Sequence, residues 1–184
     1  MVQSAKGSYD EFILCDTGST DETVKVANSL GARVLEHPMS ATWREKPEEF
    51  SFADARNYSL AQCSGDWVLI LDCDERLSKL GAKNIRKTLA GLPDSIGLVM
   101  PIIQMCTDDG HVYQQFPGER IIRNGRGACF HSEMHNWVEV EGRVVAPDIQ
   151  IVHNRRAKEQ VKRDRRNEQR IAMSERWFAE KLKA

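Results

Sequence analysis

The feature that most constrains the fold is a short apolar segment that ends in a run of acidic residues. Residues 66–71 read Asp-Trp-Val-Leu-Ile-Leu, and Asp72, Cys73, Asp74 and Glu75 follow at once. A continuously apolar run of this length is typical of a strand that is buried on both faces of a parallel sheet. In open α/β sheets, ligands bind at the carboxyl ends of such strands. The acidic residues are therefore predicted to lie at a ligand-binding edge.

The first half of the chain alternates between strand and helix patterns. An apolar run over residues 11–15, a helical pattern over residues 21–30 and an alternating run over residues 32–36 follow one another. This order predicts a parallel crossover, and a further helix is expected over residues 79–90. The predicted fold class is α/β, with a mixed sheet that is mainly parallel in the first half and flanked by helices.

The second half is expected to pair in a more antiparallel way, because its apolar runs after residue 96 are shorter and alternate with polar residues. Residues 155–184 have a helical pattern and carry 11 Lys+Arg against 5 Asp+Glu, which predicts a basic C-terminal helix. A chain of 184 residues is of the size of a single domain.

Charge and composition exclude several classes of protein. With 26 Lys+Arg against 27 Asp+Glu the net charge is -1, which argues against a nucleic-acid partner. No apolar run approaches the ~20 residues that cross a bilayer, so no transmembrane segment is expected. The N-terminus does not read as a secretory signal, and the five cysteines are scattered without a CxxC pair. We therefore expect reduced thiols and a cytoplasmic location.

The residues Asp72 and Asp74 have the spacing of a cation site, because alternate residues of an extended segment share one direction. Carboxylate oxygens suit Mg²⁺ or Mn²⁺, whose remaining positions are commonly filled by phosphate oxygens. Asp16 ends the first strand and would share this edge if the two strands run parallel. An acidic pair is often only a solvated loop, and the segment 16–21 reads equally well as a capped turn.

Arg56 lies in the helix that is expected to precede the acidic strand. A guanidinium there could bind a diphosphate or the acidic residues in a bidentate way. It could equally be a surface arginine that pairs with Asp54 or Glu49.

Three ordered motifs in this chain resemble the family 2 glycosyltransferases of the GT-A fold. They are Asp16-Thr-Gly-Ser-Thr-Asp21 after a strand, Phe50-Ser-Phe-Ala-Asp-Ala-Arg-Asn57, and Gly65-Asp-Trp67 leading to Asp72-Cys-Asp-Glu75. Three motifs in order are far more specific than one. The resemblance covers residues 10–78 and continues more weakly at 120–124, 133–136, 151–153 and 165–167.

The resemblance implies a role for each matching residue. Asp16 would hydrogen-bond the nucleobase of a nucleotide-sugar donor, and Arg56 would lie near the nucleotide. Asp72 would approach the ribose or the metal. Asp74 would bind a divalent cation, Mn²⁺ or Mg²⁺, and His153 would add a metal or phosphate contact.

The implied activity is metal-dependent transfer of a sugar from a nucleoside-diphosphate sugar to an acceptor hydroxyl, with inversion. The acceptor could be a glycan, a lipid-linked molecule or a protein. His135 matches the histidine of a His-Glu pair in the family, but Asn136 follows it here, and an amide cannot act as a general base. We assign the base to Glu133, with His135 itself as the other option.

The resemblance also divides the single domain. Residues 10–105 would form the nucleotide-sugar-binding half, residues 106–154 the acceptor-side half, and residues 155–184 the basic helix. Domains of this kind open with a further strand and helix before the segment that ends in Asp16, whereas residues 1–10 alone precede it here. Three explanations are open: the chain is a natural minimal or truncated form, a second copy or a partner chain supplies the edge strand, or residues 2–9 cover the edge.

Two other interpretations compete with an active transferase. The first is a catalytically impaired nucleotide-sugar-binding or scaffold protein of the same fold, suggested by Asn136 and the short N-terminus. The second is a phosphotransferase of the haloacid dehalogenase type, in which the first aspartate of the acidic pair is the nucleophile. The latter expects the pair on the first strand, and here two strands and a helix precede it.

Overall fold

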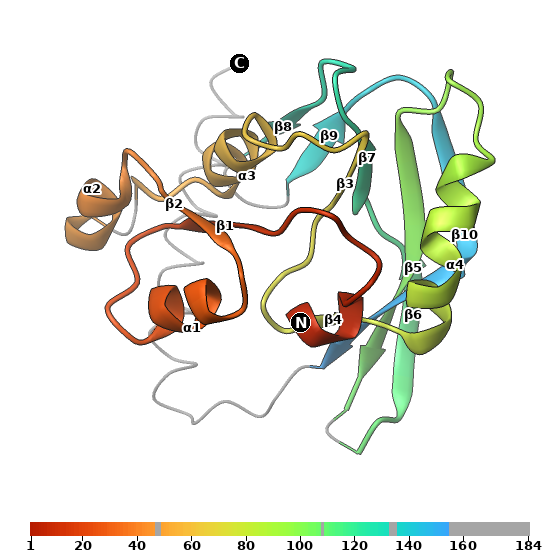
Figure 1. Ribbon diagram of the computed structural model, residues 1–184, viewed down its shortest axis with the longest axis horizontal. Coiled ribbons are helices and arrows are strands. Elements are labelled where there is room, and N and C mark those ends of the chain that lie inside the picture. Colours follow the sequence, from red (N-terminus) through yellow and green to blue (C-terminus); the bar gives the residue numbers. More distant parts are fainter. Residues whose placement is uncertain (47–48, 108, 133–135, 155–184) are drawn as a thin grey trace, which may run out of the picture. The chain divides into compact units, whose positions relative to one another are not determined.

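The computed structural model describes residues 1–46, 49–107, 109–132 and 136–154 (Figure 1). Its elements group into two compact units, and each is described by itself. The described residues of unit 1 fall within 1–11, 63–129 and 138–154, and those of unit 2 within 12–62, 130–132 and 136–137. The helix predicted over residues 155–184 lies outside the described residues.

Unit 1 is built on a six-stranded mixed sheet. The strand order is β3-β7-β5-β10-β4, and β6 also pairs with β5. β5 and β10 are parallel, and the other pairs of this sheet are antiparallel. The strands are β3 (Trp67–Leu69), β4 (Glu75–Leu77), β5 (Leu98–Cys106), β6 (Val112–Pro117), β7 (Ile121–Arg123) and β10 (Arg143–Asn154).

The helix predicted over residues 79–90 is present as α4 (Lys79–Ala90) and packs against β10. It begins where the Ser78 hydroxyl accepts a hydrogen bond from the Gly81 amide over 2.9 Å, which is an N-cap. A Cβ atom on Gly81 would lie only 2.9 Å from the carbonyl oxygen of Gln150. The glycine therefore permits close approach of the helix to β10.

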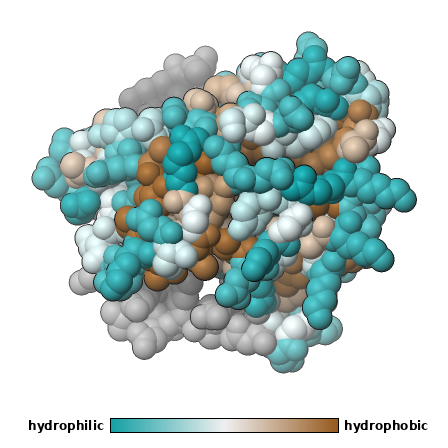
Figure 2. Space-filling view, viewed as in Figure 1, coloured by the Kyte–Doolittle hydropathy of each residue, from teal (hydrophilic) through white to brown (hydrophobic). Residues whose placement is uncertain are grey.

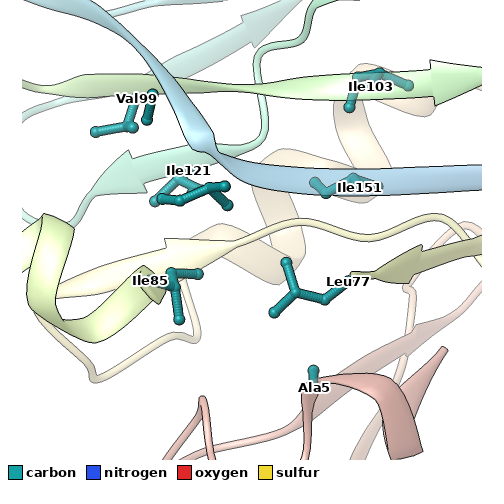
Figure 3. Packing of buried hydrophobic residues seen from close by; sticks show 9 residues of the cluster. Ala5, Leu77, Ile85, Val99, Ile103, Ile121 and Ile151 are labelled. Carbon is teal, nitrogen blue, oxygen red and sulfur yellow. The ribbon is translucent and has the colours of Figure 1, made fainter. Parts of the chain in front are cut away.

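The core of unit 1 lies between this helix and the sheet. Figure 3 shows apolar side chains of β5, β7 and β10 meeting Ile85 of α4 and Leu77 of β4. The short helix η1 (Val2–Ala5) adds Ala5, and its Ser4 hydroxyl accepts a hydrogen bond from the Leu77 amide over 3.1 Å. The buried cluster consists of Ala5, Leu77, Ile85, Val99, Ile103, Ile121, Ala146, Ile149 and Ile151.

Unit 2 contains the predicted parallel crossover. β1 (Ile13–Asp16) and β2 (Arg33–Glu36) form a two-stranded parallel sheet, with α1 (Thr23–Ser29) between them in the chain. The helices α2 (Ser40–Glu45) and α3 (Phe52–Leu60) follow, and α3 contacts β1. The Ser51 hydroxyl caps α3 by accepting a hydrogen bond from the Asp54 amide over 3.1 Å.

Aromatic side chains form a cluster in unit 2 around Trp43 of α2. The ring of His37 stacks on Trp43 with centroids 4.2 Å apart and meets the edge of Tyr58 at 4.8 Å. Trp43 in turn meets the edge of Phe50, whose ring meets that of Phe52. His37 and Trp43 are buried.

A final pair of strands, β8 (Cys129–His131) and β9 (Trp137–Glu139), forms a separate two-stranded sheet. Ser132, which follows β8, has a φ of 73°, in the left-handed region that a non-glycine residue adopts at a cost. Among the described residues, no helix has the length and apolar character needed to cross a membrane. Figure 2 shows hydrophilic and hydrophobic residues side by side on one face of the surface.

The pairing of the acidic strand differs from the expected one. β3 covers Trp67–Leu69 and pairs antiparallel with β7, whereas β1 pairs with β2 in its own sheet. A parallel neighbour was expected because β3 is apolar throughout. The residues of β3 are only partly buried, so the strand is not covered on both faces. Its Trp67 instead makes a cation–π contact, with the guanidinium carbon of Arg123 4.3 Å from the ring centroid. The mixed α/β class itself is confirmed.

Candidate functional site

The acidic residues form a tight turn in unit 1 between β3 and β4. The main chain of Asp72 and Glu75 closes the turn, because the Glu75 amide donates to the Asp72 carbonyl oxygen over 2.9 Å. The Asp72 amide donates in return to the Glu75 carboxylate over 3.0 Å. The side chains of Asp72 and Asp74 are 42% and 45% exposed, and that of Glu75 is fully buried. Two carboxylates of the turn are therefore exposed to solvent, and the third is buried.

Arg120 neutralises the buried carboxylate. Its Nε donates to Glu75 Oε2 over 3.1 Å and its Nη2 to Glu75 Oε1 over 2.7 Å, a two-pronged contact. The same Nη2 donates to Asp72 Oδ2 over 3.3 Å. Burial by itself would lower the pKa of Arg120, but hydrogen bonds and charge from Glu75, with the charges of Asp72 and Asp74, raise that pKa above its ordinary value.

His153 brings the imidazole of β10 to the same turn. β10 pairs with β4, and this register sets His153 opposite Glu75. The Nε2 atom lies 3.4 Å from Asp74 Oδ2, and the Nδ1 atom lies 3.8 Å from Glu75 Oε1. The two residues that the resemblance implies as metal ligands, Asp74 and His153, are therefore adjacent. The described residues include no group of three or more side chains that could hold a metal ion.

The turn has a negative electrostatic character. Loss of water around the thiol raises the pKa of Cys73, and the charges of Asp72 and Asp74 raise it further. The two carboxylate charges, which contribute to disfavouring a thiolate, would favour a cation near them. A carboxylate oxygen and an imidazole nitrogen, the two groups that meet here, are both ligand types of divalent metal ions.

Asp16 lies in unit 2 at the end of β1, as the sequence predicts. Its carboxylate accepts hydrogen bonds from the Ser19 amide, at 3.1 Å for Oδ1 and 3.3 Å for Oδ2. The side chain thus stabilises the loop that leads to α1, and the residue is 8% exposed. Gly18, with a φ of 105°, packs so closely that a Cβ atom would meet the Ser40 carbonyl oxygen at 2.9 Å.

Arg56 also lies in unit 2, on α3, and it contacts the segment that follows β8. Its Nη1 donates to Asn136 Oδ1 over 3.2 Å, and its guanidinium carbon lies 5.5 Å from the Phe130 ring centroid. The Asn136 amide group donates in turn to the Ser132 carbonyl oxygen. The amide oxygen of Asn136 thus contacts α3, and its amide nitrogen contacts the residue that follows β8.

The residue after Arg56 has a role that the sequence analysis did not assign. The Asn57 side chain accepts from the Phe130 amide over 2.7 Å and donates to the Phe130 carbonyl over 2.9 Å. The residues proposed as the general base, Glu133 and His135, lie outside the described residues. Arg120 was also missed, although it belongs to a stretch that weakly resembles the family; its partner Glu75 is 45 positions away.

The family model described as glycosyl transferase family 2 matches residues 2–139. The chain belongs to this family.

Several curated proteins are similar to the chain, among them the following three. A TPR repeat-containing protein of Synechococcus elongatus is 32% identical over 75% of the chain and 31% of that protein. An uncharacterized glycosyltransferase of Rickettsia felis is 40% identical over 42% of the chain and 24% of that protein. A lipopolysaccharide core biosynthesis glycosyltransferase of Rhizobium meliloti is 27% identical over 73% and 49%. The matched part of the chain thus spans 24% to 49% of the length of these relatives.

Among solved structures, the chain is similar to glucosyl-3-phosphoglycerate synthase from Mycobacterium tuberculosis. That structure is a complex with Mn²⁺, uridine diphosphate and glucosyl-3-phosphoglycerate. It is 30% identical to this chain, with a TM-score of 0.43, and the alignment covers 56% of this chain and 38% of that chain.

Proposed function

We propose that the protein is a glycosyltransferase that moves a sugar from a nucleoside-diphosphate sugar to an acceptor hydroxyl and requires a divalent cation. Membership of glycosyl transferase family 2 supports the reaction class. The observation that carries the metal requirement is the 3.4 Å approach of His153 Nε2 to Asp74 Oδ2. Both atoms are ligands that Mn²⁺ accepts, and Mg²⁺ accepts the carboxylate.

The residues of the turn fit such a cation. Asp74 is the more exposed of the two carboxylates, and His153 comes from the neighbouring strand, so they approach one point from different elements. Two protein ligands leave coordination positions for water and for diphosphate oxygens. When bound, the cation neutralises the diphosphate and helps the nucleoside diphosphate to leave. Asp72, whose carboxylate is restrained by Arg120, would accept a hydrogen bond from a ribose hydroxyl.

The nucleotide contacts proposed for unit 2 rest on the sequence motifs. Asp16 has its carboxylate oriented by the Ser19 amide, and a carboxylate is an acceptor for a nucleobase N–H group. Arg56 would complement the charge of the diphosphate, and its present contact with Asn136 would hold it in place before the nucleotide binds.

For the transfer step we keep Glu133 as the general base, with His135 as the other option, and inversion at the anomeric carbon. The base would take the proton of the acceptor hydroxyl while that oxygen bonds to the anomeric carbon and the diphosphate leaves. Asn136 does not favour a catalytically impaired protein, because its amide has a use of its own between Arg56 and Ser132. We also propose that the acceptor is a glycan, a lipid-linked molecule or a protein, and that a second copy or a partner chain can complete the sheet edge. A cytoplasmic location is also proposed, supported by cysteines that are scattered along the sequence without a CxxC pair.

A thermal-shift screen of the purified protein tests this proposal. Nucleoside diphosphates and nucleotide-sugars would each be added with and without Mn²⁺ or Mg²⁺. A ligand at ~100 times its dissociation constant stabilises the folded state by ~2.7 kcal/mol. We expect stabilisation that needs both a nucleotide and a metal, and the responding base identifies the donor. Equal melting temperatures under all conditions would contradict the proposal.

A further inference from the structure

The buried carboxylate of Glu75 stands at the centre of the turn and faces three different groups. It receives the fork of Arg120, at 3.1 Å and 2.7 Å, and the main-chain amide of Asp72, at 3.0 Å. Its Oε1 atom also lies 3.8 Å from His153 Nδ1. Glu75 therefore lies on the side of the imidazole opposite to Asp74, which approaches Nε2.

Arg120 is anchored to the same turn through its main chain. Its carbonyl oxygen accepts a hydrogen bond from the Ile70 amide over 2.8 Å, one residue beyond the end of β3. Its side chain is 17% exposed and reaches Asp72 as well as Glu75. A single residue thus connects the strand that precedes the turn with two of its three carboxylates.

The chemistry of burial explains why a guanidinium is needed here. A fully buried carboxylate is costly unless it is paired and its lone pairs are hydrogen-bonded. A planar guanidinium donates from Nε and Nη2 at once and still reaches Asp72, whereas a lysine ammonium is a single point charge. The two hydrogen bonds from Arg120 therefore set the orientation of the Glu75 carboxylate. This carboxylate is the group that faces Nδ1 of His153.

We infer that Arg120 and Glu75 are positioning residues for the proposed cation site: Arg120 fixes Glu75 and Asp72, and the negative charge of Glu75, 3.8 Å from Nδ1, favours the orientation of the His153 ring in which Nε2 faces Asp74. This inference rests on the proposed function. Groups that contact the far side of a metal-binding histidine typically change metal affinity 10–100-fold when they are altered.

The chain offers a matched control three residues further along. Arg123 is the last residue of β7 and is 19% exposed, close to the value for Arg120, which directly precedes that strand. Its side chain donates to the main-chain oxygens of Leu92, Pro93 and Ile96 and pairs with Asp94. Arg123→Lys therefore breaks a comparable set of bonds without touching Asp72 or Glu75.

The test is a titration of the whole protein with Mn²⁺ alone, in which electron paramagnetic resonance measures the free ion. Relative to the unmodified protein, we expect the dissociation constant to rise at least about tenfold for Arg120→Lys and to stay within about twofold for Arg123→Lys. Glu75→Asp keeps the charge for Arg120 but shortens the side chain, and it should also raise the constant about tenfold. This variant decides the matter if Arg120→Lys does not fold.

The outcomes separate the inference from the proposed function. If the unmodified protein binds Mn²⁺ and both arginine variants bind it equally well, the inference is wrong and the cation site stands. If the unmodified protein does not bind Mn²⁺, the cation site and the inference are both overturned.

Discussion

The guanidinium of Arg56 donates a hydrogen bond to the amide oxygen of Asn136 over 3.2 Å, and this bond ties α3 to the residue that precedes β9. The Asn136 amide group donates onward to the Ser132 carbonyl oxygen. An asparagine serves this position well, because a glutamate carboxylate could accept from Arg56 but could not donate to Ser132.

This relationship predicts an energetic coupling between Arg56 and Asn136. In a double-mutant cycle with Arg56→Ala and Asn136→Ala, the coupling in the free energy of unfolding should be about 0.5–1.5 kcal/mol, the usual contribution of one hydrogen bond. Urea denaturation of the two single variants and the double variant measures it. Strict additivity would show that the bond contributes nothing to stability.

The stability of the protein should fall with decreasing pH because of His37. Burial lowers the pKa of this histidine, and the charge and backbone of Asp54 offset the change only in part. Its Nδ1 accepts a hydrogen bond from the Met39 amide, which needs the neutral ring. As the pH drops below the unfolded value of about 6.5, the unfolded state takes up the proton first, so stability that is present above this pH is lost.

The expected slope for one such proton is up to about 1.4 kcal/mol per pH unit between the folded and unfolded pKa values. Urea denaturation at a series of pH values measures it. His37→Asn keeps an acceptor for the Met39 amide and should remove this slope, whereas replacement of the exposed His111 by alanine should leave it. A slope that survives in His37→Asn would assign the effect to another group.

Two glycines with the same backbone conformation should respond differently to alanine. Gly142 and Gly125 have φ values of 74° and 72°. A Cβ atom on Gly142 would collide with the Ser95 carbonyl oxygen, whereas nothing lies within 4 Å of one on Gly125. Gly125→Ala should cost about 1–2 kcal/mol for the left-handed conformation alone. Gly142→Ala should cost about 1–3 kcal/mol more through the collision, and equal costs in urea denaturation would contradict the described packing.

The buried face of β10 should dominate the stability of unit 1. Ile151 is fully buried in the core cluster, whereas Val145 on the same strand is 43% exposed. Ile151→Ala should lower the free energy of unfolding by about 2–5 kcal/mol. Val145→Ala should lower it by less than about 1 kcal/mol. Chemical denaturation of both variants makes the comparison, and a larger effect at Val145 would rule out this assignment of the core.

Features that depend on neighbouring residues could be predicted from the sequence. Helix α4 matches the expected range 79–90, because Ser78 caps its first turn and an apolar stripe continues to its end. The β1-α1-β2 crossover was predicted for the same reason. The closeness of Asp74 and His153 followed only from the resemblance to the family, since 79 positions separate them in the sequence.

Features that depend on distant partners could not be predicted. The apolar run of β3 indicated burial but not which strand it would pair with, and its antiparallel partner β7 carries no signal of that choice. The side-chain amide of Asn57 makes hydrogen bonds to the main chain of Phe130, 73 positions away. Nearly every residue has such main-chain groups, so the sequence does not indicate which one Asn57 contacts. Arg120 reads as an ordinary strand arginine until its fork is seen on Glu75.

The central claim is that Asp74 and His153 hold the cation through which a nucleotide donor binds. The most direct measurement is the Mn²⁺-dependent thermal stabilisation by nucleoside diphosphates in Asp74→Asn and His153→Ala, beside the control variants Asp66→Asn and His111→Ala at exposed positions. We predict that the stabilisation is lost in the first pair and kept in the second. Unchanged stabilisation in Asp74→Asn and His153→Ala would contradict the account.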